Sequence, residues 1–157
     1  MRGQIEPKSL ESDLFLPWII VAIMSVTLIA YIIICHTMGE QIQQPLPEAQ
    51  RVFIRTVLYV VGIVTFPLTN LIRHIQLRLN QTMPGPNPAK NRYLVTIIVS
   101  MALIESVGVF GLVMFIFGDG FNTLYIFTGM SALGLFLYRP KLDEYTRIVE
   151  ALACAKS

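Results

Sequence analysis

This sequence indicates an all-α, polytopic membrane protein with four transmembrane helices and a short C-terminal amphipathic helix. Composition is the first reason, because 54% of the 157 residues are hydrophobic and only 14% are charged. An ordinary soluble domain carries charge on about a quarter of its residues. The second reason is that the apolar residues gather into four runs separated by polar segments rich in Pro or Gly. Lipid offers no hydrogen-bond partner to bare backbone, so each run is expected to be a helix. We expect a single domain over residues 1–157.

The first two predicted spans are residues 14–35 and 53–72. The first run is longer than the apolar part of a signal peptide and no small-residue cleavage site follows it, so it is expected to stay as an anchor. The segment GEQIQQPLPE after it predicts a loop. In the second span, Gly62, Thr65 and Thr69 fall on one stripe, and Pro67 is expected to kink the helix.

The last two predicted spans are residues 93–117 and 121–138. A Gly118-Asp119-Gly120 turn joins them, so a tight antiparallel hairpin is expected. Each of the four runs is about 18 to 25 residues long, enough to cross roughly 30 Å of hydrocarbon. Beyond them, one helical face collects the apolar residues of the C-terminal segment. This pattern predicts an amphipathic helix lying on the membrane or on a partner. The apolar face comprises Tyr145, Ile148, Val149 and Leu152.

The basic residues predict the orientation in the membrane. Ten of the 12 Lys and Arg residues fall on one side of the predicted spans, and only Arg51 and Arg55 fall on the other. Cytoplasmic segments carry the excess of positive charge, so both termini are expected in the cytoplasm, with the protein in a plasma or inner membrane. The ten are Arg2, Lys8, Arg73, Arg78, Lys90, Arg92, Arg139, Lys141, Arg147 and Lys156.

The main candidate site is Glu105, which is the only charged residue in the third run. An acidic residue at the bilayer centre costs about 2.5–3.5 kcal/mol on insertion scales, so it faces protein or water, or is held protonated. It either binds a proton or cation, or it serves as hydrogen-bond glue between helices. Several hydroxyl side chains lie at a similar depth or beside it and are candidates to support the carboxyl. They are Ser25, Thr27, Thr65, Ser106, Thr128 and Ser131.

The stretch from Ala102 to Phe115, ALIESVGVFGLVMF, resembles the carboxylate helix of the proteolipid c subunit of rotary ATP synthases. That family places a Glu or Asp in mid-membrane, followed by an aliphatic, aromatic and Gly-Leu-Val pattern. A cytoplasmic polar loop precedes its carboxylate helix, as residues 73–92 do here. The resemblance implies that Glu105 binds and releases a proton or Na⁺ as helices rotate past a half-channel.

The sequence offers few other motifs for catalysis, cofactor binding or metal binding. The sequence holds no nucleotide loop, no paired Cys ligands and no Ser–His–Asp set, so neither catalytic activity nor a cofactor is expected. His36 and Glu40 have the i, i+4 spacing of a helical metal site, but Gly39 and the nearby prolines predict a loop, and no metal site is expected. The expected partners are the lipid bilayer and other membrane subunits or further copies of the chain, and not nucleic acid.

Two functions remain open. In the first, the chain is a small integral membrane subunit that binds or relays a proton or cation at Glu105 within a larger assembly. In the second, it is a non-catalytic accessory or anchoring subunit of a membrane complex, and Glu105 is structural.

Overall fold

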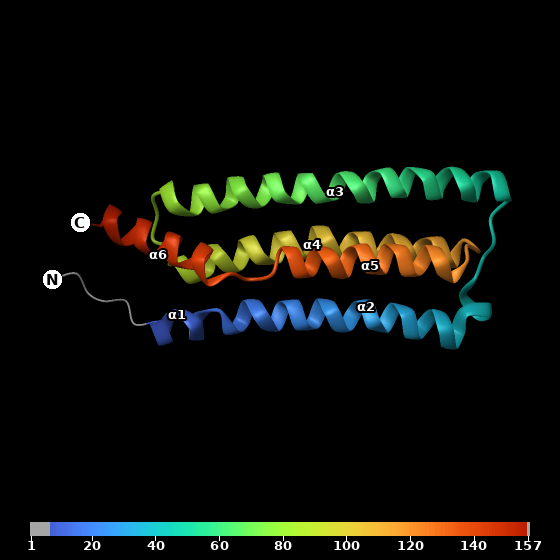
Figure 1. The fold of residues 1–157 in the computed structure, drawn as a ribbon, viewed down its shortest axis with the longest axis horizontal. Coiled ribbons are helices and arrows are strands. Elements are labelled where there is room, and N and C mark those ends of the chain that lie inside the picture. Colours follow the sequence, from blue (N-terminus) through green and yellow to red (C-terminus); the bar gives the residue numbers. More distant parts are fainter. Residues whose placement is uncertain (1–6, 157) are drawn as a thin grey trace.

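The computed structural model describes residues 7–156, which form six helices and no strand (Figure 1). Arg2, one of the ten basic residues that predict the orientation, lies outside the described residues. The helices are α1 (Pro7–Asp13), α2 (Phe15–Ile42), α3 (Glu48–Thr82), α4 (Ala89–Ile116), α5 (Phe121–Leu137) and α6 (Leu142–Ala155).

The long helices run side by side, with the α4–α5 hairpin in the middle and α2 and α3 on either side of it (Figure 1). The hairpin confirms the predicted turn: Gly118 has a φ of 91°, a conformation that glycine adopts without strain. The short helices α1 and α6 lie together at one end of the bundle. The α2–α3 and α4–α5 connections lie at the other end (Figure 1).

By length and composition, three helical stretches among the described residues can cross a membrane: Lys8–Ile42, Glu48–Thr82 and Ala89–Ile116. There are four if α5 and α6, which meet at a 44° bend, are taken as one span. Helices α2, α3 and α4 extend beyond the predicted spans at one or both ends, because backbone hydrogen bonds continue where the apolar run ends. The predicted loop at Gly39 is therefore wrong: Gly39 lies inside α2, where a Cβ would be 3.0 Å from Cζ of Phe115. Pro67 lies inside α3, which continues across it as one helix, and the kink expected there stays a prediction.

The outer faces of α2 and α3 are apolar and exposed. Ile23, Val26 and Ile29 on α2, and Phe53 and Ile63 on α3, each expose more than half of their surface. A soluble monomer rarely exposes a contiguous apolar patch of more than a few hundred Å². Such faces suit contact with lipid or with other membrane helices.

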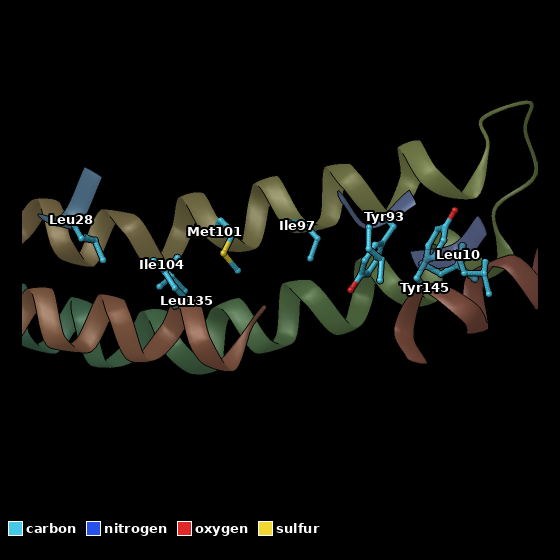
Figure 2. Packing of buried hydrophobic residues seen from close by; sticks show 10 residues of the cluster. Leu10, Leu28, Tyr93, Ile97, Met101, Ile104, Leu135 and Tyr145 are labelled. Atoms are coloured by element: carbon cyan, nitrogen blue, oxygen red, sulfur yellow. The ribbon is translucent and has the colours of Figure 1, made fainter. Parts of the chain in front are cut away.

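The core follows α4, which contributes the largest set of buried residues (Figure 2). One cluster runs along this helix from Ile104 through Met101 and Ile97 to Tyr93. Glycine allows the hairpin to close tightly, since a Cβ on Gly111 would lie 2.9 Å from Cβ of Phe127 on α5. The small residues near Glu105 therefore serve helix packing.

The amphipathic helix is confirmed as α6. Tyr145 and Ile148 are buried, and Val149 and Leu152 pack against the same cluster. The apolar face lies on α3, α4 and α1 of its own bundle, and so it is already covered by this chain. The sequence could not show this, because an amphipathic pattern does not identify what covers it.

Candidate functional site

Glu105 lies in the middle of α4, on a face that meets α2. Only 8% of its surface is exposed. The hydroxyl of Tyr31 on α2 donates a hydrogen bond to Oε1 over 3.3 Å. The second oxygen, Oε2, is buried and has no hydrogen-bond partner among the described residues. The carboxyl is thus desolvated, and its hydrogen bonding is incomplete.

The described residues bring no cation to this carboxyl. Their ion pairs join Arg55 to Asp119, Arg73 and Lys141 to Glu144, and Lys90 to Asp13. These pairs lie near the ends of the bundle. Along α4, at 1.5 Å per residue, Glu105 is about 18 Å from Tyr93 and about 16 Å from Ile116, where the helix ends before Asp119. A charge on Glu105 would therefore have no close counter-ion in this part of the chain.

The six hydroxyls proposed to support Glu105 are placed by the structure, and none of them donates a hydrogen bond to it. Ser25, Thr27 and Thr65 each donate to the carbonyl one helical turn earlier, at distances of 2.7–2.9 Å. Ser106 donates to the carbonyl of Leu103. Ser131 donates across the hairpin to the carbonyl of Ile104.

Thr128 is the remaining candidate. It is 7% exposed, and its hydroxyl has no partner among the described residues.

The predicted stripe of α3 is buried as a unit, with Gly62, Thr65 and Thr69 all facing the bundle.

Tyr31 is the partner that the sequence analysis missed. It lies six positions beyond Ser25, about 9 Å of helical rise, and therefore at a similar depth. Tyr is most often placed at the membrane interface, and it was not considered as a mid-membrane donor. A search that included every side chain able to donate a hydrogen bond would have found it.

At the α4–α5 turn, both oxygens of the Asp119 carboxylate accept hydrogen bonds. Nη1 of Arg55 lies 3.0 Å and 3.2 Å from the two oxygens of Asp119. The backbone N–H of Gly120 and the hydroxyl of Thr123 also donate to Asp119, each over 3.0 Å. Arg55 thus ties α3 to the α4–α5 hairpin.

The opposite end holds a second network around Arg73, which is 4% exposed. Its guanidinium donates to the carbonyls of Tyr138 and Arg139 and to Oε2 of Glu144, over 2.6, 3.2 and 2.7 Å. The hydroxyl of Tyr93 donates to the same carboxylate oxygen over 3.0 Å. The sequence placed Arg73 in a loop, whereas it lies inside α3 and fixes the bend between α5 and α6.

His36, weighed above as a metal ligand, is helical after all. Its Nε2 lies 2.6 Å from the hydroxyl of Tyr125, and its ring stacks on Phe121 with centroids 4.4 Å apart. Across the part of the chain that the structure describes, no three His, Cys, Asp or Glu side chains gather as metal ligands do. His36 therefore serves contact between α2 and α5.

Chemically, the Glu105 site offers one carboxyl and one phenol hydroxyl. That set can hold and release a proton. It falls short of the 6–8 oxygen ligands of a calcium ion or the octahedral set of magnesium.

Comparison with known proteins gives no further information on this site. No protein family, curated protein or solved structure matches the chain. The local resemblance of residues 102–115 to the c subunit of rotary ATP synthases stays a prediction.

Proposed function

We propose that the chain is a four-span integral membrane subunit that binds and relays a proton at Glu105, within a larger assembly. The observation that carries the proposal is Oε2 of Glu105, which is buried and unbonded. An ionised carboxylate there would be a desolvated charge with one long hydrogen bond and no cation, and such a group is costly. The neutral acid suits the site, and loading or unloading a proton is the reaction that it supports.

A proton is favoured over a metal cation by the shortage of oxygen ligands. Only the Tyr31 hydroxyl bonds to Glu105 among the described residues. Helix rotation within an assembly, as in the family that residues 102–115 resemble, would move the carboxyl between this site and an aqueous path.

The proposed setting is a plasma or inner membrane with both termini in the cytoplasm. The ten-to-two distribution of Lys and Arg supports that orientation. The exposed apolar faces of α2 and α3 leave room for lipid and for other membrane subunits or further copies of this chain.

A second function is favoured by one specific contact. The Tyr31–Glu105 hydrogen bond joins α2 to α4, and such a bond between helices can act as glue in lipid. The chain would then be a non-catalytic accessory or anchoring subunit, with Glu105 holding the bundle together.

A hydrophobic carbodiimide tests whether Glu105 is a neutral acid in the membrane. The carboxylic acid adds across a C=N bond of the reagent to give an O-acylurea, which rearranges to a stable N-acylurea that mass spectrometry detects. We expect one adduct on Glu105 at pH 7. Glu105→Gln should abolish it, while Glu40→Gln, at an exposed position on α2, should leave it unchanged. Absence of an adduct on Glu105 would contradict the proposal.

Proton relay is separated from structural glue by comparing assembly with proton uptake in the same vesicles. An amide still donates and accepts hydrogen bonds but does not titrate near neutral pH. If Glu105 relays protons, Glu105→Gln assembles normally and abolishes uptake, and Glu105→Asp retains part of it. Retention of both assembly and uptake in Glu105→Gln would favour the accessory subunit. Loss of both would favour the structural role.

A further inference from the structure

A groove of about 640 Å³ runs between α2 and α5. Its walls are largely apolar, with Leu28, Ile29 and Ile32 from α2 and Ala132, Leu135 and Phe136 from α5. The volume lies within the range of about 300–1,000 Å³ that small-molecule sites occupy. Neither Glu105 nor Tyr31 lines this groove, so it is separate from the proposed proton site.

One end of the groove carries a cation and an amphipathic aromatic residue. Arg139 and Trp18 line that end. Arg139 donates to the carbonyl of Phe136 over 2.8 Å and stacks over the Phe136 ring at 4.5 Å. No carboxylate forms an ion pair with Arg139 among residues 7–156. A guanidinium has five N–H donors in a fork that fits a phosphate, so a phosphate can be received here.

A second hollow adjoins this end and shares Trp18 with the groove. Lys8 and Glu11 of α1 line it, so the two hollows together carry two cations and one carboxylate. Trp is enriched at the level of lipid headgroups, and two cations flank this one. The mouth of the groove therefore has the composition of a headgroup site.

The depth of the groove matches one leaflet. Thr128 lines its inner part and Arg139 its mouth. Helix α5 rises about 14 Å from Thr128 to its last residue, Leu137, and Arg139 follows two positions later. This rise is about half of the ~30 Å hydrocarbon core. The groove thus reaches from the interface at the α1–α6 end to the middle of the membrane.

We propose that this groove binds an anionic phospholipid of the leaflet at the α1–α6 end, with an acyl chain along the apolar wall and the phosphate on Arg139. A helix from another chain fits less well. Helices pack closely in lipid where small residues line the contact. Ser25, Thr128 and Ala132 are small, but the bulkier Ile29, Ile32 and Phe136 also line this wall. A flexible chain can follow these branched and aromatic side chains.

The unbonded hydroxyl of Thr128 distinguishes the two occupants. It is buried at the inner end of the groove. An acyl chain forms no hydrogen bond with it, but a polar side chain of a docked helix would. Removing this hydroxyl should therefore leave lipid binding unchanged.

Native mass spectrometry of the full chain, released from bilayers of phosphatidylglycerol and phosphatidylcholine, tests the proposal. We expect one phosphatidylglycerol retained per chain. Arg139→Gln should weaken its binding about fivefold, the effect of one basic residue near anionic lipid. Arg147→Gln makes the same charge change at an exposed position on α6 and should have no effect. Equal retention of both lipids, or of phosphatidylglycerol in Arg139→Gln, would overturn the proposal.

A second pair of variants tests the groove itself. Ala132→Phe fills it, whereas Leu133→Phe adds a similar ring at the next position, which is exposed and outside the groove. Only Ala132→Phe should displace the lipid. Thr128→Val should keep it. If Thr128→Val or Ala132→Phe instead dissociates an oligomer while phosphatidylglycerol stays bound, the groove holds a helix and the lipid proposal fails.

Discussion

Acidic side chains at the two ends of the bundle differ in their hydrogen bonding from the acidic side chain in its middle. Asp119 at one end receives hydrogen bonds from Arg55, Gly120 and Thr123. Glu144 at the other end receives them from Arg73 and Tyr93. Glu105 in the middle has a single bond of 3.3 Å and one oxygen without a partner.

The difference indicates different roles. At the ends, the carboxylates join helices through ion pairs and fix how the connections pack, which is a structural task. In the middle, where an unpaired charge costs most, the same kind of group is left incomplete. Under the proposed function, this incompletely bonded side chain is the one that binds and releases a proton.

The largest expected effect of breaking an end network is at Arg73. Arg73→Met removes the cation that bonds to Glu144 and to the carbonyls of Tyr138 and Arg139. Because Glu144 is then left without its buried cation, the free energy of unfolding should fall by about 3 kcal/mol. Unfolding by dodecyl sulfate in micelles measures this, with Arg78→Met on the exposed side of α3 as the control. Equal stability of the two variants would show that the network contributes nothing.

A smaller effect is expected at the opposite end. Asp119→Asn removes the charge that pairs with Arg55, whose side chain is 33% exposed. The amide oxygen can still accept from either Gly120 or Thr123, which bond to different oxygens of Asp119. The loss should be about 1 kcal/mol, as for a partly solvated ion pair, and it should shrink at high salt. Asp143→Asn, at an exposed position on α6, is the control. A loss as large as that of Arg73→Met would erase the difference between the two ends.

An effect of similar size concerns α6, whose Tyr145 donates to Asp13 on α1 over 2.7 Å. Burial, and then the Asp13 carboxylate, raise the pKa of the Tyr145 hydroxyl. Since the folded protein favours the neutral phenol, this contribution is complete below the unfolded value of about 10 and is lost as pH rises above it. Tyr145→Phe should cost about 1 kcal/mol at pH 7.

The same variant should also remove part of the alkaline loss of stability. Unfolding curves at pH 8 and pH 11 check both statements. An unchanged difference between wild type and Tyr145→Phe at the two pH values would contradict them.

Much of the fold could be predicted because it depends on local sequence. Apolar runs, the glycine turn and the face of α6 are all read from neighbouring residues. The helix ends could not be predicted so well, because α2 continues through Gly39 once Phe115 packs against it. Hydropathy indicates where a helix leaves the lipid, whereas the helix itself ends where its backbone hydrogen bonds stop.

The candidate site was predicted only in part. Glu105 stands out as a single charge in an apolar run, but its partner depends on how α2 turns about its own axis. Because α2 is apolar all round, no amphipathic pattern shows which of its faces points toward α4, and Tyr31 was missed. Arg73 was missed for a similar reason, since its partners lie more than 60 residues away in the sequence.

The contrast between the middle and the ends depends on the protonation of Glu105, which infrared spectroscopy in lipid measures directly. The account predicts a carbonyl band of a protonated carboxyl at pH 7 that disappears in Glu105→Gln. The band should shift but persist in Tyr31→Phe, which removes the single hydrogen bond. A carboxylate band at pH 7, lost in Glu105→Gln, would contradict the account.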